Sequence, residues 1–315
     1  MPIARTPMFK DYRQIEWDAE VEDDCRQLIR LAVREDLERL YDWTTVALVP
    51  DAAPGSARVV ARKPGVIAGL PAARVALDEY DPTIEWRAVV SDGEVVAAGT
   101  SVAELSGKAR SLLAVERPLL NLLGHLSGIA TLTRQFVEAV AGTTARIYDT
   151  RKTMPGWRRL EKYAVRAGGG HNHRLGLFDG VLIKDNHLAL GAASHDPRYT
   201  PAQAVTAVRR FLDQLDESSS HHEMLVEVEV DSLEQLGEVL PASPDIVLLD
   251  NMPPDMLRRA VELRDRLAPG VELEASGGIN LQTVAAVARS GVERISVGAL
   301  THSAEWLDLG LDWAI

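Results

Sequence analysis

A cluster of cationic side chains stands out in an otherwise acidic sequence. The chain of 315 residues carries 34 Lys and Arg against 46 Asp and Glu, a net charge of −12. Between Thr150 and His187 the balance reverses, with eight basic residues against three acidic ones. The eight are Arg151, Lys152, Arg158, Arg159, Lys162, Arg166, Arg174 and Lys184. A local positive region of this kind indicates either a small anionic ligand or a solvated basic face.

Two motifs in this region carry groups suited to anion binding. Thr150, Arg151 and Lys152 follow an apolar run; arginine can hold a carboxylate or phosphate in a fork, and lysine supplies a mobile point charge. Residues 167–174 read AGGGHNHR, and the glycines allow backbone to approach a ligand closely before His173 and Arg174. Arg174 is the stronger anion ligand, while His173 could donate a hydrogen bond or bind a metal. A glycine-rich surface turn is the alternative.

Three ionisable residues stand where further apolar runs end. Lys184, Glu229 and Asp250 each follow a short run rich in Val, Leu and Ile. A lysine in that position is partly removed from water and needs an anionic partner, either a ligand or one of the two acids. The two carboxylates could hold Mg²⁺, accept hydrogen bonds from sugar hydroxyls, or balance the basic region. We expect Glu227 to face the same side as Glu229, because side chains alternate along a strand.

Glycines also accompany two later strand ends. The two segments comprise Ser276, Gly277 and Gly278, which lead into a helix, and Val297, Gly298 and Ala299. Free N–H groups at a helix start, with glycines beside them, can cradle a phosphate. Taken together, these groups predict a small, highly anionic ligand that carries both phosphate and carboxylate.

The elements that must position these groups alternate between strand and helix. Apolar runs at 145–148, 180–183, 225–228, 245–249, 271–275 and 294–297 each stop at a polar residue or glycine. Helices are indicated at 201–215, 231–240, 254–267 and 281–290, with Asp231 and Glu234 resembling a capping box. This alternation predicts a parallel sheet in a TIM-like barrel, with an open doubly wound sheet as the alternative. We expect an α+β domain over residues 1–125 and the α/β barrel over 126–315.

Composition excludes several classes of protein. No stretch approaches about 20 apolar residues, so no membrane span is expected, and the polar N-terminus does not look like a secretory signal. An acidic chain with 5% aromatic residues is poorly suited to nucleic acid. Cys25 is the single cysteine and cannot form an internal disulfide, so we expect a cytoplasmic protein.

The motifs together resemble the quinolinate phosphoribosyltransferase family. The matching text is ERPLLN at 116–121, DTRKT at 149–153, AGGGHNHRLGLFDGVLIKDNH at 167–187, EVEV at 227–230, LDN at 249–251 and EASGGI at 274–279. The resemblance implies an α+β sandwich-like first domain and an incomplete, seven-stranded TIM-like barrel. It also implies the conversion of quinolinate and phosphoribosyl pyrophosphate to nicotinate mononucleotide, pyrophosphate and CO₂ in de novo NAD biosynthesis, with Mg²⁺.

The same resemblance implies a role for each candidate residue. Arg117, Arg151, His173, Arg174 and Lys184 would hold the two carboxylates of quinolinate, and Lys152 would serve quinolinate or pyrophosphate. Glu229 and Asp250 would serve the ribose hydroxyls and Mg²⁺, and Ser276, Gly277, Gly278 and Gly298 would bind the 5′-phosphate. Thr150, Val297 and Ala299 complete the substrate-binding set, and Lys184, Glu229 and Asp250 are the expected catalytic residues. A homodimer, or a hexamer built from dimers, is implied, with Arg117 reaching the neighbouring site.

Two other functions stay open at this point. A paralogue could keep the barrel and bind the same ligands without the reaction, or use a different acceptor. A metal-dependent barrel hydrolase is suggested by the pair His171 and His173 followed by Lys184 and Asp250. Against the hydrolase, Lys184 lies only 11 residues after His173, and the local cations would repel a metal centre.

Overall fold

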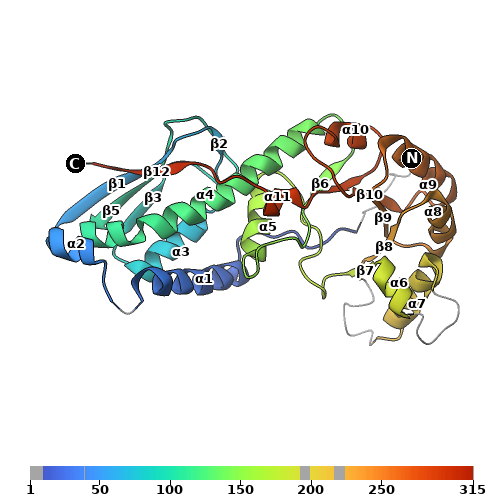
Figure 1. Cartoon of the computed structure of the whole chain (residues 1–315), viewed down its shortest axis with the longest axis horizontal. Coiled ribbons are helices and arrows are strands. Elements are labelled where there is room, and N and C mark those ends of the chain that lie inside the picture. The colour runs from blue at the N-terminus through green and yellow to red at the C-terminus, as the bar shows by residue number, and fades with distance from the viewer. Residues whose placement is uncertain (1–9, 39, 192–198, 216–223, 315) are drawn as a thin grey trace, which may run out of the picture. The chain divides into compact units, whose positions relative to one another are not determined.

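A computed structural model describes residues 10–38, 40–191, 199–215 and 224–314 (Figure 1). Two segments to which the sequence assigns no role, 192–198 and 218–222, lie outside the described residues. The chain divides into two compact units, each built from three stretches of sequence. The parallel-sheet unit comprises 1–13, 138–151 and 172–297, and the antiparallel-sheet unit comprises 14–137, 152–171 and 298–315. The domain boundary expected near residue 125 stays a prediction.

The parallel-sheet unit alternates strands with helices, as the sequence predicts. Its elements are β6 (Arg146–Tyr148), β7 (Val181–Ile183), α6 (Asp185–Gly191), α7 (Pro201–Asp213), β8 (Val226–Val230), α8 (Leu233–Val239), the 3₁₀ helix η3 (Leu240–Ala242), β9 (Ile246–Asp250), α9 (Pro254–Leu267), β10 (Glu272–Ser276), α10 (Val284–Ala288) and β11 (Arg294–Ser296). Each strand is three to five residues long and mostly buried. Helices that follow buried strands in this way return the chain for the next parallel strand.

The strand order identifies the incomplete barrel. The sheet has the order β6-β11-β10-β9-β8-β7, and every neighbouring pair is parallel. The order runs steadily from β7 to β11 and never reverses, whereas a doubly wound sheet reverses at a switch point. β6 and β7 are the edge strands, so the sheet is open between them. Among the described residues six strands pair in this sheet, where the family resemblance implies seven.

One predicted helix start is wrong. Helix α8 begins after Ser232, whose side chain accepts a hydrogen bond from the Gln235 N–H, and not at a capping box of Asp231 and Glu234. Serine and aspartate are comparable N-caps, so the sequence alone does not separate the two registers. The helix over 254–267 is confirmed, with Pro254 in its first turn.

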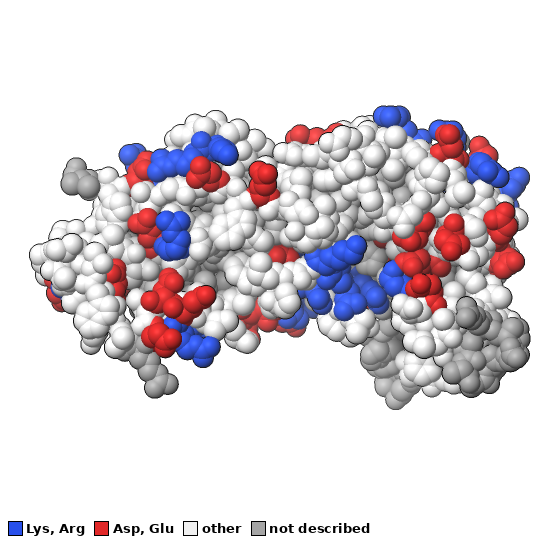
Figure 2. Space-filling model, viewed as in Figure 1, with Lys and Arg blue, Asp and Glu red and all other residues white. Residues whose placement is uncertain are grey.

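Positive charge gathers on one part of the surface. In Figure 2, Lys and Arg form a patch close to the position of β7 in Figure 1, while acidic and basic side chains are mixed over much of the remaining visible face. Two residues of the basic region, Arg174 and Lys184, flank β7 in the sequence.

The antiparallel-sheet unit combines a twisted sheet with long helices. Its elements are α1 (Ala19–Leu37), α2 (Trp43–Leu48), β1 (Pro54–Ala61), β2 (Gly65–Val66), α3 (Leu70–Tyr80), β3 (Glu85–Ala88), β4 (Val95–Val96), β5 (Ser101–Lys108), most of α4 (Ala109–Ala139), α5 (Arg158–Ala167), α11 (Ala299–His302) and β12 (Leu309–Trp313). The main sheet has the order β12-β1-β5-β3, and β2 pairs with β4. The long helix α4 continues through Pro118.

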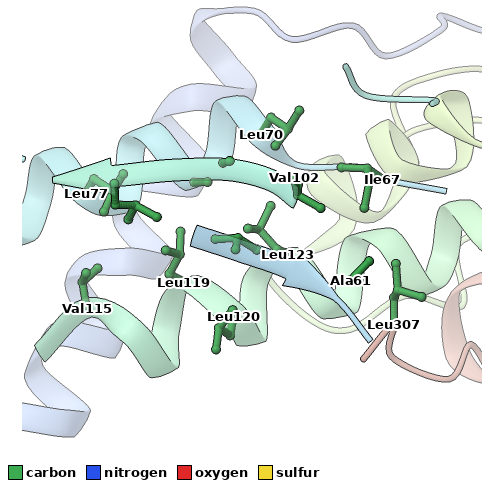
Figure 3. Close-up of a cluster of buried hydrophobic side chains, with 14 of the residues drawn as sticks. Ala61, Ile67, Leu70, Leu77, Val102, Val115, Leu119, Leu120, Leu123 and Leu307 are labelled. Carbon is green, nitrogen blue, oxygen red and sulfur yellow. The ribbon is translucent and has the colours of Figure 1, made fainter. Parts of the chain in front are cut away.

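An apolar core holds this unit together (Figure 3). Leu119 and Leu123 of α4 are fully buried against side chains from β1, β5 and α3, among them Val59, Val102 and Leu77. Each such leucine stabilises the fold by roughly 1.5–3 kcal/mol through the apolar area it removes from water. No helix among the described residues has the length and hydropathy needed to cross a bilayer.

Candidate active site

Most of the predicted site residues lie in the parallel-sheet unit at the carboxyl ends of its strands. Thr150 and Arg151 follow β6, Lys184 follows β7, Glu229 lies near the end of β8, and Asp250 ends β9. Ser276 pairs with Asp250 at the end of β10, and Gly277, Gly278 and Val297 follow the ends of β10 and β11. In a TIM-like barrel this edge of the sheet carries the active site.

Lys184 and Glu229 form an ion pair, as expected for a lysine at a strand end. The Lys184 Nζ contacts Glu229 Oε2, with the lysine side chain 41% exposed and the glutamate 17%. Asp250 is half-buried on the neighbouring strand and accepts a hydrogen bond from the Asn251 side chain at 2.8 Å. Because Lys184 neutralises Glu229, the three side chains of Lys184, Glu229 and Asp250 together carry about one net negative charge. Such a donor set suits a Mg²⁺ ion that takes its remaining oxygen ligands from a substrate phosphate. It suits a permanently bound ion less well.

The loop that carries Arg174 is held by a buried aspartate. Asp149 Oδ2 accepts a hydrogen bond from the Asn172 side chain at 2.7 Å, and its Oδ1 accepts one from the His173 backbone N–H at 2.9 Å. Asp149 and Asn172 are fully buried. Arg174 is itself only 8% exposed, so its guanidinium is fixed near the strand ends and is not a mobile surface group.

His173 has polar partners on both ring nitrogens. Nε2 lies 3.1 Å from Glu227 Oε2 and 3.4 Å from Glu274 Oε1, and Nδ1 accepts a hydrogen bond from the Arg174 backbone N–H at 2.8 Å. Burial lowers the pKa of His173, but the two carboxylates outweigh burial and raise that pKa. The Arg174 N–H acts against protonation of Nδ1, because a protonated Nδ1 has no lone pair to accept it. In either state Nε2 carries a proton, which Glu227 Oε2 accepts, while Glu274 Oε1 lies further away.

Further charges fill the inner face of the sheet below His173. Arg294 is fully buried and donates to Glu274 at 3.1 Å and to Glu272 at 3.1 Å. Its guanidinium also lies 3.7 Å from the centre of the Tyr148 ring. Burial would raise the pKa of Glu274, but His173 and Arg294 lower that pKa to about 2. Barrel interiors are usually filled by Val, Ile and Leu, so a charged interior departs from the usual pattern.

Tyr12 joins this interior from the N-terminal segment. Its hydroxyl donates to Glu227 Oε2 at 2.6 Å, and its ring stacks on His173 with the centroids 4.6 Å apart. Gly180 leaves the space for the ring, since a Cβ there would lie 2.7 Å from a Tyr12 ring carbon. Tyr12 is 3% exposed.

The two glycines of the predicted phosphate cradle, Gly277 and Gly278, lie in different surroundings. Gly277 has a φ of +96°, and a Cβ there would clash with the Asn251 side chain and lie 3.0 Å from the Asn251 backbone nitrogen. Gly278, with a φ of +63°, faces open space. Helix α10 does not begin until Val284, so its N-terminus is not directly beside the glycines as the sequence suggested.

Four predicted residues belong to the antiparallel-sheet unit: Arg117, Lys152, Gly298 and Ala299. Arg117 is exposed on α4. Lys152 and Gly298 lie together, because a Cβ on Gly298 would be 3.0 Å from Lys152 Cδ. The Thr301 hydroxyl donates to the Lys152 carbonyl oxygen at 2.8 Å and fixes the backbone there.

Sequence reasoning missed Tyr12 and Arg294 and gave Asp149 and Glu274 no role of their own. One signal was available, because β8 reads VEVEV and β10 reads ELEAS. Parallel strands covered on both faces usually read as continuous apolar runs, so regular alternation with acids indicates a polar interior. Tyr12 carries no such signal, since it is 215 residues from its partner Glu227.

Three side chains of the kind that bind metals lie close together in this interior. Among the described residues, His173, Glu227 and Glu274 have ligand atoms within 4.8 Å of one another. Both carboxylates already have other partners, with Tyr12 on Glu227 and Arg294 on Glu274. The neighbouring guanidinium also disfavours a divalent cation there.

Comparison with known proteins gives a consistent picture. Residues 42–127 match the model of the quinolinate phosphoribosyl transferase N-terminal domain, and residues 129–312 match that of the C-terminal domain. A nicotinate-nucleotide pyrophosphorylase [carboxylating] of Mycobacterium leprae is 47% identical, covering 92% of this chain and 97% of the relative. A quinolinate phosphoribosyltransferase [decarboxylating] of Nicotiana glauca is 38% identical over 91% of this chain and 82% of the relative.

Solved structures agree with the sequence comparison. The structure of the nicotinate-nucleotide pyrophosphorylase from Francisella tularensis superposes with a TM-score of 0.84 at 34% identity, covering 96% of this chain and all of that one. The family models together span most of the chain, and the relatives match it nearly end to end. The chain therefore belongs to the quinolinate phosphoribosyl transferase family.

Proposed function

We propose that the protein transfers a phosphoribosyl group from phosphoribosyl pyrophosphate to quinolinate, forming nicotinate mononucleotide, pyrophosphate and CO₂. The observation that carries this proposal is the group of cations near the strand ends, where Arg151 follows β6, Lys184 follows β7 and Arg174 lies in the loop before β7. Burial lowers the pKa of Arg174 and the charge of Arg151 acts in the same direction, whereas Tyr12, Glu227 and Asp179 act to raise that pKa. Two guanidinium groups that repel each other are stabilised when a dianion binds between them, and quinolinate carries two adjacent carboxylates. Lys184 adds a third cation at the end of β7.

The sugar phosphate would occupy the neighbouring strand ends. Ser276, Gly277 and Gly278 follow β10, where Gly278 faces open space that can admit a phosphate close to the backbone. Glu229 and Asp250 lie on the adjacent strands and can accept hydrogen bonds from the ribose hydroxyls. Thr150, Lys152, Val297, Gly298 and Ala299 complete the proposed substrate-binding set.

The chemistry fits these residue types. The pyridine nitrogen forms a bond to the anomeric carbon of the sugar while the bond from that carbon to pyrophosphate breaks. Positive charge that develops on the sugar is stabilised by the carboxylates of Glu229 and Asp250. The bond from the ring to the neighbouring carboxylate then breaks, CO₂ leaves, and its electron pair stays on the ring carbon beside the positively charged nitrogen. A proton from solvent completes the product. By orienting both substrates, the protein supplies much of the rate.

Mg²⁺ is the proposed cofactor, held by Glu229 and Asp250 together with pyrophosphate oxygens. When bound, the ion would neutralise negative charge on the leaving group. We further propose a homodimer, or a hexamer of dimers, in which the exposed Arg117 completes the neighbouring site, and a cytoplasmic location.

The proposal is tested by measuring pyrophosphate release with both substrates and Mg²⁺. Arg174→Ala and Lys184→Ala should each reduce kcat/KM at least about 100-fold, because each removes charge-assisted hydrogen bonds of roughly 1.5–3 kcal/mol. Arg258→Ala is a matched control, because Arg258 is an exposed cation on α9 whose partner Asp255 is also exposed. It should leave activity and melting temperature unchanged. Wild-type turnover in either site variant would contradict the assignment, and binding of both substrates without pyrophosphate release would favour a non-catalytic paralogue.

A further inference from the structure

We propose that His173 is a positioning residue that fixes the Arg174 loop from the interior of the barrel and does not itself bind the substrate. This inference rests on the proposed function, because it assigns the dianion to Arg174 and its cationic neighbours. It departs from the role that resemblance alone would give to His173, which is direct contact with a substrate carboxylate.

The Nε2 side of the ring is committed to the interior. Its proton is accepted by Glu227, whose Oε2 lies 3.1 Å away, and Glu274 lies 3.4 Å away. Both glutamates are fully buried, and Glu227 is held in turn by the Tyr12 hydroxyl at 2.6 Å. A donor aimed at two buried carboxylates is directed away from any ligand at the strand ends. Turning it outward would leave those carboxylates short of a donor, which is costly in the interior.

The Nδ1 atom of the His173 ring is hydrogen-bonded to the backbone. It accepts the backbone N–H of Arg174 at 2.8 Å, so the imidazole links the buried glutamates directly to the residue that bears the guanidinium. One face of the ring is covered by Tyr12. With both nitrogens engaged and the residue 5% exposed, His173 has no donor to offer a substrate carboxylate.

Buried acids therefore hold the same short loop from two sides. Asp149 accepts from the Asn172 side chain and from the His173 N–H, while the glutamates act through the His173 ring. Together they define the backbone path that leads into Arg174. A displacement of about 1 Å in a positioning group can lower the rate substantially, so Glu227 should influence catalysis although it is fully buried.

The first test is a double-variant cycle read out as the quinolinate dissociation constant and as kcat. Glu227→Gln should weaken quinolinate binding roughly three- to tenfold, as expected for one weakened hydrogen bond. His173→Gln should weaken it by more, and the double variant should be no worse than His173→Gln alone, because both act through one linkage. Glu272→Gln is the matched control, since Glu272 is an equally buried acid that pairs with Arg294 and Arg146. Normal quinolinate binding by Glu227→Gln, with a large loss in His173→Gln, would overturn the proposal.

The second test uses the folded wild-type protein, so its result does not depend on whether the variants fold. The ¹⁵N resonances of the His173 ring should be unchanged when quinolinate saturates the protein, since neither nitrogen gains a new partner. A change in the protonation of either nitrogen on binding would overturn the proposal. If wild-type protein does not bind quinolinate at all, the proposed function fails. The contact between His173 and Glu227 can then still be tested, because Glu227→Gln must shift the His173 Nε2 resonance in the free protein.

Discussion

The interiors of the two compact units contain opposite kinds of side chain, apolar in one and charged in the other. In the antiparallel-sheet unit, Leu119, Leu123 and their neighbours form a core of aliphatic side chains (Figure 3). In the parallel-sheet unit, the inner face of the sheet carries Glu227, Glu274 and Arg294, all fully buried. Aliphatic contacts are non-directional and tolerate replacement by residues of similar volume. Buried charges must each have a partner of the right geometry, so the interior of the parallel-sheet unit constrains its side-chain positions more strictly.

The difference corresponds to what each region does. The apolar core only has to keep its sheet and helices together. The charged interior lies directly below the strand ends and, through His173, reaches the loop that bears Arg174. A buried network of hydrogen bonds and ion pairs restrains side-chain positions, and a site that binds a dianion needs that restraint.

The largest expected effect comes from removing one charge from the polar interior. Arg294→Met leaves Glu272 and Glu274 without their buried partner and should lower the free energy of unfolding by about 3–5 kcal/mol. Leu119→Ala in the apolar core should lower it by about 2–5 kcal/mol through the lost contacts and the cavity. Denaturant unfolding at several pH values separates the two.

The pH dependence should distinguish the two interiors. The loss in Arg294→Met should shrink as pH falls, because Glu274 has lost a cation that lowers its pKa and becomes protonated more readily. The loss in Leu119→Ala should not change with pH. Leu119→Ala should also keep its activity per folded molecule. A loss in Arg294→Met that does not depend on pH would contradict the lowered pKa of Glu274.

A smaller effect is expected at the proposed phosphate cradle. Gly277→Ala forces a Cβ against Asn251 and strains a φ of +96°, so it should raise the KM for phosphoribosyl pyrophosphate and lower stability by about 1–3 kcal/mol. Gly278→Ala, which faces open space, should cost only the smaller backbone strain of a left-handed residue, about 1–2 kcal/mol. Initial rates and thermal melts measure both. Equal effects of the two substitutions would show that Asn251 does not constrain Gly277.

A further effect is expected in the acid dependence of stability that Glu274 confers. Its pKa in the folded protein is about 2, below the ordinary value, because His173 and Arg294 favour the carboxylate despite burial. A group with a lowered folded pKa stabilises the protein above the unfolded pKa, and that stability is lost as pH falls from about 4.5 towards 2. Glu274→Gln should therefore flatten this part of the curve of unfolding free energy against pH. The exposed Asp255→Asn is the control and should leave it unchanged.

Much of the fold could be predicted from the sequence because the barrel signal is periodic. The strand runs that end at Lys184, Glu229 and Asp250 were visible as apolar stretches closed by a polar residue, and the strand order confirms the incomplete barrel. The ion pair of Lys184 with Glu229 followed from the cost of leaving a lysine unpaired at a strand end.

The interior could not be predicted in the same way because its partners are distant in sequence. Arg294 and Glu274 look like ordinary surface charges when each strand is considered alone, and only the pairing of β10 with β11 brings them together. Tyr12 reaches Glu227 across most of the chain. Such contacts depend on tertiary structure and not on local pattern.

The most direct test of the proposed reaction is the release of CO₂ from quinolinate labelled at the carboxylate beside the ring nitrogen. Purified protein should release labelled CO₂ only when phosphoribosyl pyrophosphate and Mg²⁺ are both present, in equal amount to the pyrophosphate formed. Arg174→Ala should reduce that release at least about 100-fold while remaining folded. Release that does not require phosphoribosyl pyrophosphate, or none from wild-type protein that binds both substrates, would contradict the proposed function.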